Sequence, residues 1–355
     1  MDRKRILQAV FAVVVCGGVG LAFPVFNLFS AQLSLDSHEN RLMTGLPQVL
    51  QSPPSELLQN LDTFLVDNAP FRYQLVLMDA GWDYNLFGTS QSDQVLPGKD
   101  GWLFYKDGPT AAQPVANYQG LAETYDDAET LARASAGLQI LSDRLAHAGC
   151  TLVLDLTPGK DRIYREYMPE GYPVVNEQSR TDLAAAYLQS HTTVPVIWER
   201  DTLRSLARRD PDRLLYYKTD THWNPLGALV QLDVILQQLG LPTLPPEEYP
   251  VQECGVHTGD MANVAALYQV LPDEPDYEVP GYADLFAQDP RVVRVIGDSF
   301  SEYYMPYLEA RFAAAWREHI DTFDPTLADD PKCDILILEA NERTLDTLFA
   351  LLGQF

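Results

Sequence analysis

Apolar and polar residues follow two different rhythms along most of the chain. From about residue 126 onward, segments with helical apolar spacing alternate with short, almost continuous apolar runs. Helical spacing covers residues 126–149, 178–191, 225–240, 301–319 and 341–353, and strand-like runs cover 150–156, 194–198, 291–300 and 333–340. This alternation predicts an α/β fold in which a mostly parallel sheet is flanked by helices, in three layers.

The part of the chain before residue 126 is organised differently. Between Ser55 and Gly88 the apolar spacing is helical but is interrupted at Pro70, which predicts two helices. The run Gly98–Tyr105 (GKDGWLFY) joins a turn signal to residues that suit a buried strand.

The N-terminus contains an uncharged apolar stretch from Ile6 to Phe29, directly after the cluster Asp2–Arg5. Roughly 20 apolar residues suffice to span a bilayer, and basic residues before such a span predict a cytoplasmic N-terminus with an exported body. A signal peptide cleaved near Gly20–Ala22 and a buried core helix are the alternatives. We favour an uncleaved signal anchor, because the apolar run continues past that cleavage site.

These patterns divide the chain into three expected parts. They are a transmembrane helix at 1–30, a membrane-proximal helical segment at 31–97 and a main domain at 98–355, with an irregular, Pro-rich and acidic insertion at 240–290.

The charge balance narrows the classes of partner. The chain has 25 basic and 50 acidic residues, a formal net charge of −25. Such a surface repels phosphate backbones, so nucleic-acid binding is not expected, and a basic patch on anionic lipid is disfavoured. No Cys/His cluster has zinc-ligand spacing, and we expect no metal and no other cofactor.

Two cysteines are expected to lie close together in the fold. Cys150 and Cys333 each open a strand-like run, so neighbouring parallel strands would bring them together. A disulfide is possible in an oxidising compartment, but we favour two buried thiols.

The first chemical signal is Ser299, in the run Val295–Phe300 (VIGDSF). Here a strand ends in a tight turn, and a serine at the start of the next helix presents its hydroxyl at the carboxyl end of the sheet. Backbone N–H groups at that helix start can stabilise an oxyanion. A simple helix cap by Asp298 or Ser299 is the alternative.

The second signal is the run Thr219–Pro225 (TDTHWNP). Residues two apart in an extended segment project to one side, so Asp220 and His222 converge. A serine nucleophile needs a base and a carboxylate that orients the base, and this run supplies both. A buried histidine bonded to local backbone, and a metal site that would need a third ligand, are the alternatives.

Taken together, these motifs resemble a known family. GDSF resembles the nucleophile block of the SGNH hydrolase superfamily, and the order GKDGWLFY, TDTHWNPLGA, GDSF resembles the AlgJ/AlgX-like alginate O-acetyltransferase family. His38–Pro47 and Asp67–Arg72 (DNAPFR) are similar to that family's membrane-proximal segment. The resemblance covers roughly residues 36–355, and it implies an SGNH hydrolase-like fold.

The resemblance also implies roles for individual residues. Ser299 would be the nucleophile, His222 the general base and Asp220 its orienting carboxylate. The Asp-x-His spacing matches these acetyltransferases and departs from the Asp-x-x-His of ordinary SGNH esterases. Further candidates for oxyanion or substrate contact are Asn224, Asn341, Lys160, Arg343 and Glu339. For the last three, ion pairing in loops and helix caps is an equal alternative.

The implied function is an extracytoplasmic O-acetyltransferase of an exported or cell-envelope polysaccharide, located at the cell membrane. A membrane-bound O-acyltransferase is the implied supplier of acetyl groups. The negative charge leads us to expect a neutral or amino-sugar polymer rather than a polyanion. A carbohydrate acetylesterase with the same triad and a non-catalytic glycan-binding envelope protein are the alternatives.

Overall fold

The computed structural model describes residues 10–11, 17 and 43–355 of the chain. The expected transmembrane helix at 1–30 therefore lies almost entirely outside the described residues. Among the residues that are described, no helix is both long and apolar enough to cross a membrane. The chain divides into two compact units, residues 1–91 with 263–270 and residues 92–262 with 271–355, and each is described by itself.

The first unit is helical in its described part. It contains α2 (Leu46–Leu50), α3 (Leu57–Asp67), α4 (Arg72–Trp82) and a π-helical turn at Asp83–Phe87. The predicted break at Pro70 is confirmed, since the next residue, Phe71, has a φ of 58° and separates α3 from α4. Many apolar side chains of this unit are exposed, and on α4 they recur at helical spacing: Leu75, Met78 and Trp82.

The second unit is built on a five-stranded sheet in which every neighbouring pair is parallel. Its strands are β3 (Thr151–Thr157), β4 (Val196–Trp198), β7 (Asp289–Gly297), β8 (Phe312–His319) and β9 (Ile335–Asn341). They lie in the order β4-β3-β9-β7-β8. This arrangement confirms the predicted parallel α/β sheet. It places β9, the last strand, at the centre and β7, the strand before Ser299, beside it.

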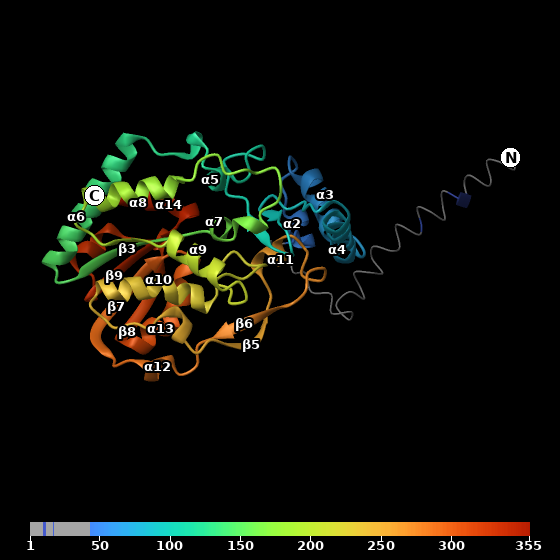
Figure 1. Cartoon of the computed structure of the whole chain (residues 1–355). Coiled ribbons are helices and arrows are strands. Elements are labelled where there is room, and N and C mark those ends of the chain that lie inside the picture. Colours follow the sequence, from blue (N-terminus) through green and yellow to red (C-terminus); the bar gives the residue numbers. More distant parts are fainter. Residues whose placement is uncertain (1–9, 12–16, 18–42) are drawn as a thin grey trace. The chain divides into compact units, whose positions relative to one another are not determined.

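The two faces of the sheet bury separate hydrophobic cores, as the alternation of side chains along a strand requires. On β9, Ile335 and Ile337 belong to one core, whereas Leu336 and Leu338 belong to the other. Figure 1 shows α6 (Ala128–His147), α8 (Arg180–His191) and α14 (Leu345–Leu352) on one side of the sheet, and α10 (Pro225–Gln238) and α13 (Met305–Arg311) on the other. The three-layer arrangement is thus confirmed.

Side-chain caps start three of these helices, α6, α8 and α10. Asp127 accepts a hydrogen bond from the N–H of Thr130 at the start of α6, and Ser179 forms a reciprocal capping box with Asp182 at the start of α8. α6 then buries Leu138, Leu141 and Leu145. The remaining short helices include α5 (Ala116–Gln119), α7 (Lys160–Ile163), α9 (Arg200–Arg209), α11 (Asp260–Val264) and α12 (Tyr282–Leu285).

The single helix predicted over residues 301–319 is wrong in its second half. The segment forms a 3-10 turn at Ser299–Tyr304, the helix α13 and then the edge strand β8. Phe312 is fully buried and already extended, and from there the backbone pairs with β7. The alanines after it favour a helix locally, but pairing with the open edge of β7 outweighs that preference.

The insertion predicted at 240–290 has some regular structure of its own. It contains an antiparallel ribbon of β5 (Gln252–His257) and β6 (Glu274–Glu278). A second antiparallel pair, β1 (Val95–Pro97) with β2 (Leu103–Tyr105), surrounds the predicted turn, so the strand expected in GKDGWLFY is confirmed.

The two cysteines that were expected to approach each other do so. Sγ of Cys150 lies 3.6 Å from Sγ of Cys333, and both are free thiols. Cys150 is buried and Cys333 is half-buried.

Candidate active site

Ser299 lies where the interior strand β7 gives way to a 3-10 turn, at the carboxyl end of the sheet. The turn is tight because Gly297 has no side chain: a Cβ there would stand 2.4 Å from Oε2 of Glu339 and 2.8 Å from Oγ of Ser301. Asp298 caps the turn by accepting a hydrogen bond from the N–H of Phe300. The hydroxyl of Ser299 is therefore left outside this local bonding and points to the neighbouring segment.

That neighbouring segment is the loop before α10, which carries Asp220 and His222. The hydroxyl Oγ of Ser299 lies 2.7 Å from Nε2 of His222, and Nδ1 of His222 lies 2.7 Å from Oδ1 of Asp220. Because a carboxylate only accepts hydrogen bonds, Nδ1 carries the proton and Nε2 is free to accept one from Ser299. The two sequence motifs thus meet in one hydrogen-bonded array, the Ser299–His222–Asp220 array.

The carboxylate of Asp220 accepts four hydrogen bonds. Oδ1 accepts from Nδ1 and from the backbone N–H of His222, and Oδ2 accepts from Nε2 of His257 and from the backbone N–H of Asp260. Burial alone would raise the pKa of Asp220, but these donors outweigh burial and hold its pKa well below the ordinary value. The group therefore stays ionised beside His222 across the physiological range of pH.

Two buried charged side chains hold the backbone of this loop from opposite sides. Nζ of Lys160 donates to the carbonyl oxygens of Tyr217, Lys218 and Asp220, at 2.9, 2.7 and 2.5 Å. The carboxylate of Glu274, on β6, accepts from the N–H groups of Lys218 and Thr219. Burial lowers the pKa of Lys160 to about 7, against the opposing effect of the nearby carboxylates. Lys160 therefore supports the loop, while its contact with a substrate stays a prediction.

Replacing Lys160 by methionine is expected to destabilise the protein by about 2 to 4 kcal/mol, since buried carbonyl oxygens would lose their donor. Urea unfolding followed by circular dichroism measures this loss. Lys332→Met is the matched control, because the side chain of Lys332 is 70% exposed, and we expect it to leave stability unchanged. Equal stability of the two variants would contradict the assigned role.

Trp223 connects the two motifs directly. Its Nε1 donates to the carbonyl oxygen of Phe300 at 3.1 Å, and the ring is fully buried. The ring of Phe300 in turn lies 4.9 Å from that of His222, between centres. These contacts fix the distance between the loop and the serine turn.

The two asparagines proposed as oxyanion donors have other partners. Oδ1 of Asn224 caps α10, and its Nδ2 donates to the carbonyl oxygen of Leu214. Nδ2 of Asn341 donates to the carbonyl oxygen of Thr157, and its Oδ1 accepts from Arg343. Both side chains are almost completely buried, at 1% and 0% exposure. We therefore assign them to local structure.

Glu339 and Arg343 lie close to the site in different ways. Glu339 is fully buried on β9, where it accepts hydrogen bonds from the N–H of Asp298 and the hydroxyl of Thr157. The guanidinium of Arg343 stands 4.4 Å from the ring centre of Tyr105 and 5.6 Å from that of Phe300. Glu339 thus supports the serine turn, while Arg343 lines a pocket beside it.

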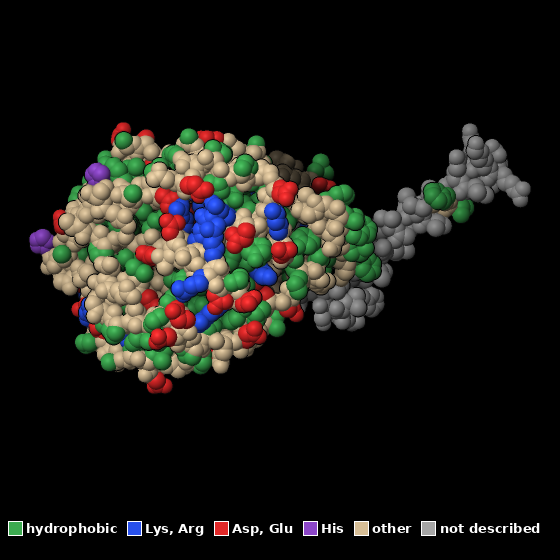
Figure 2. All heavy atoms as spheres, in the orientation of Figure 1, with side chains coloured by type: hydrophobic (Ala, Val, Ile, Leu, Met, Phe, Trp, Pro, Cys, Tyr) green, Lys and Arg blue, Asp and Glu red, His purple; other side chains and the backbone are tan. Residues whose placement is uncertain are grey.

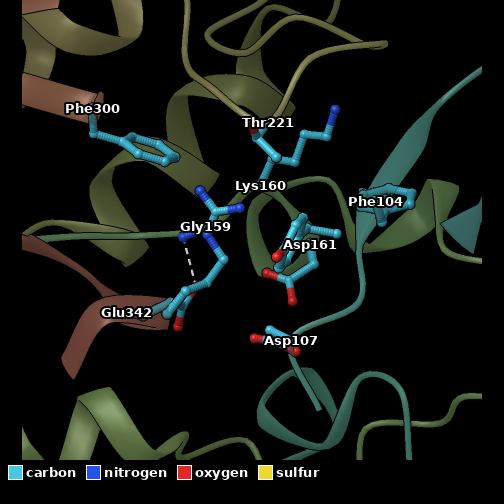
Figure 3. A pocket seen from close by; sticks show the side chains of 10 residues that line it. Phe104, Asp107, Gly159, Lys160, Asp161, Thr221, Phe300 and Glu342 are labelled. Carbon is cyan, nitrogen blue, oxygen red and sulfur yellow. Dashed lines mark hydrogen bonds between the residues drawn. The ribbon is translucent and has the colours of Figure 1, made fainter. Parts of the chain in front are cut away.

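This pocket contains an unexpected group of acidic side chains. Figure 3 shows Phe300 on one wall and Asp107, Asp161 and Glu342 on another, with Glu342 bonded to the N–H of Gly159. Burial raises the pKa of Asp107 to about 7 and that of Glu342 to about 8, and it also raises the pKa of Asp161. Part of this group is therefore protonated near neutral pH, which lets it donate as well as accept hydrogen bonds.

Side chains that lie far away in the sequence complete the site, and the motifs did not reveal them. His257 and Glu274 come from the ribbon, and Asp260 comes from α11. Ligand-type atoms of Asp220, His222 and Asp260 lie within 4.8 Å of one another. The atoms of Asp220 and His222 are engaged in the array, and both carboxylate oxygens of Asp260 accept from Thr221. We therefore assign this group to the hydrogen-bonded array rather than to a metal.

Comparisons with known proteins point to one family. The family described as "SGNH hydrolase-like domain, acetyltransferase AlgX" matches residues 95–317. The probable alginate O-acetylase AlgJ of Pseudomonas syringae pv. tomato is 29% identical over 265 residues, 68% of this chain and 62% of that protein. AlgJ of Azotobacter vinelandii is 26% identical over 246 residues, 62% of this chain and 58% of that protein. The chain thus spans less than two thirds of these relatives.

A comparison with solved structures finds a similar fold. The structure of Bacillus cereus PatB1 with a sulfonyl adduct matches 73% of this chain and 98% of its own chain, with a TM-score of 0.51 and 14% identity. At that identity the similarity shows the fold alone.

Proposed function

This chain belongs to the SGNH hydrolase-like AlgX acetyltransferase family, as its motifs predicted, and on that premise we propose that it is an extracytoplasmic O-acetyltransferase acting on a polysaccharide. Ser299 would carry the acetyl group, His222 would move the protons and Asp220 would orient His222. The observation that supports this assignment is the chain of two 2.7 Å contacts from Ser299 through His222 to Asp220.

The proposed reaction has two steps. In the first, Ser299 gives its proton to Nε2 of His222 and attacks the acetyl carbon, and the donor's leaving group departs with that proton. In the second, a sugar hydroxyl gives its proton to His222 and attacks the acetyl-serine, and Ser299 leaves and regains the proton. The N–H groups at the start of the 3-10 turn are the candidates for holding the oxyanion in both steps.

Mass spectrometry of the purified protein after incubation with an activated acetyl ester tests the first step. We propose that acetyl appears on the peptide containing Ser299 when the wild type is quenched early, and that a His222 variant, which lacks the base of this step, is labelled more slowly. Acetyl on other residues only would refute the assignment.

Hydrolysis is the second candidate, because the His222 side chain is 15% exposed and water can reach it. A transferase and an acetylesterase share the first step and differ in whether a sugar hydroxyl or water accepts the acetyl group. Acetate release and acetyl transfer from one donor, measured with and without a glycan, separate the two. We expect transfer to exceed release once an acceptor glycan is present.

The surface charge bears on the acceptor. With a net charge of −25, the protein repels a polyanion at long range, which supports a neutral or amino-sugar polymer. Figure 2 shows basic side chains gathered over α9 on one face, with acidic side chains around them. At least one of these arginines is neutralised locally, since Arg200 pairs with Asp182 and Asp201. Acetylation of chemically defined glycans tests this proposal, and activity on a polyuronate alone would contradict it.

A location at the membrane follows from the same proposal. The apolar stretch Ile6–Phe29 would anchor the protein with its catalytic unit outside the cytoplasm. A membrane-bound O-acyltransferase would supply the acetyl group, and anchoring would raise the effective concentration of the site near that supply. The exposed apolar side chains of α4 support a position next to a membrane or a membrane protein. Fractionation of cells that produce the full chain tests the location.

A further inference from the structure

Two imidazole rings share the carboxylate of Asp220. His222 contacts Oδ1, whereas Nε2 of His257, at the end of β5, lies 3.0 Å from Oδ2. Since the carboxylate only accepts, His257 carries a proton on Nε2 and donates it to this bond. We propose that His257 is a positioning residue of the site: it holds Asp220 in the orientation that aligns His222, and its charge sets how basic His222 is. This inference rests on the function proposed above.

The contacts of His257 hold its ring in one position. Its ring stacks on Tyr217, with centres 3.6 Å apart and planes within 9° of parallel. The hydroxyl of Tyr217 bonds to Asp276 on β6, and its carbonyl oxygen accepts from Lys160. The side chain of His257 is only 16% exposed. The ring is thus confined between the ribbon and the loop that carries Asp220, and it cannot turn away without breaking these contacts.

The other donor on Oδ2 makes the argument specific. The backbone N–H of Asp260 also lies 3.0 Å from Oδ2, so the two bonds come from the same side of the carboxylate. Without His257, one backbone N–H would remain to fix Oδ2, and the carboxylate would gain rotational freedom. A loosely held carboxylate orients its histidine less well, and misplacement of that kind lowers the rate of proton transfer.

The charged side chains that act most strongly on His257 are acidic, although the buried ammonium of Lys160 also bonds to the backbone of Tyr217 and Asp220. The acidic side chains are Asp220 from the loop, and Glu274 and Asp276 from β6. Oδ1 of Asp276 lies 4.0 Å from Nδ1 of His257. Burial lowers the pKa of His257, but the bond and charge of Asp220 and the charges of Glu274 and Asp276 outweigh it, so that its pKa is raised overall. His257 therefore keeps its proton to a higher pH than an ordinary imidazole does.

The sign of the effect on His222 follows from this charge. A protonated His257 neutralises part of the charge of Asp220 and so disfavours the imidazolium form of His222. Once His257 loses its proton, the whole charge of Asp220 stabilises that imidazolium. Removing the charge of His257 should therefore make His222 more basic and move the acid limb of the pH–rate profile to higher pH.

Two variants separate the bond from the charge. His257→Gln keeps an uncharged N–H donor near the position of Nε2, whereas His257→Leu removes both donor and charge. The rate of acetylation of Ser299 by 4-nitrophenyl acetate is measured from about pH 5 to pH 9, the range in which imidazoles titrate. We expect His257→Leu to be about tenfold slower at its plateau and His257→Gln to stay within about threefold of the wild type. The acid limb should move to higher pH in both.

The exposed His147 provides the matched control as His147→Gln, which should behave as the wild type. A wild-type rate and an unmoved acid limb in His257→Leu would overturn the inference. An equal loss in both variants, accompanied by a lowered Tm, would also overturn it, because His257 would then only support the fold.

A measurement that needs no turnover keeps the two proposals apart. The titration of the His222 ring, followed by NMR, should move to higher pH in His257→Gln, and an unchanged titration would overturn the inference. If the wild type is never acetylated on Ser299, the proposed function fails, and the NMR titration still decides whether His257 tunes His222.

Discussion

Ser299→Ala is expected to abolish acetylation of the protein by an activated ester and to lower acetyl transfer by about 10⁴-fold or more, since no other group would replace the nucleophile. Ser299 is half-buried, and its hydroxyl bonds to His222, so loss of this one oxygen should leave the fold unaffected. Stopped-flow acylation kinetics and intact-protein mass spectrometry measure the loss, and circular dichroism checks the fold.

Ser190→Ala is the control for this change, because the hydroxyl of Ser190 is on the exposed end of α8 and bonds to its own helix. It should retain full activity. If Ser299→Ala still transferred acetyl to a glycan at the wild-type rate, the acyl-serine route would be wrong and the scaffold alternative would gain support.

Asp220→Asn is expected to lower the acylation rate by about 10³- to 10⁴-fold, close to the effect of the same change in other serine triads. All four hydrogen bonds to Asp220 come from N–H donors, on His222, His257 and Asp260. An asparagine offers one oxygen and one NH₂ group, so on one side an N–H would face another N–H. His222 would then lose either its orientation or the tautomer that accepts the proton of Ser299.

The pH–rate profile is the second measurement on this variant. Without the carboxylate charge, His222 becomes easier to deprotonate, so the acid limb should move to lower pH while the plateau falls. Asp212→Asn, at an exposed position, is the control and should change neither. A plateau within about threefold of the wild type in Asp220→Asn would show that His222 does not depend on Asp220.

Some of the contacts behind these expectations could be predicted from the sequence, and others could not. The strands β3 and β9 were predictable, because each is a short apolar run buried on both faces and that pattern is local. β7 was predictable from the apolar residues at its buried end. The convergence of Asp220 and His222 was equally local, since they lie two positions apart. The segment bends at these residues instead of running extended, and the N–H of His222 donates to Oδ1 of Asp220. The serine turn was predictable from the small residue and the polar cap that follow an apolar run.

Other features depend on partners far away along the chain. Residues 312–319 read as a helix because alanine favours one, and only the open edge of β7 made them a strand. Lys160 read as a possible substrate contact, yet three carbonyl oxygens of the loop before α10 bind it. Asn224 and Asn341 were predicted as oxyanion donors, yet their side-chain oxygens cap the start of α10 and of the turn after β9.

The sequence by itself therefore determined the class of fold, the family and the three residues of the array, because periodicity and short motifs report on neighbours along the chain. Only the tertiary structure decided the order of the strands and the pairing of the edge strand β8. It also decided how Lys160 and Glu274 hold the loop before α10. His257 is the clearest case: it lies 37 positions after Asp220, and no spacing rule connects them. The ribbon brings them together because it stacks His257 on Tyr217, in the loop that carries Asp220, and the buried carboxylate needs hydrogen-bond donors.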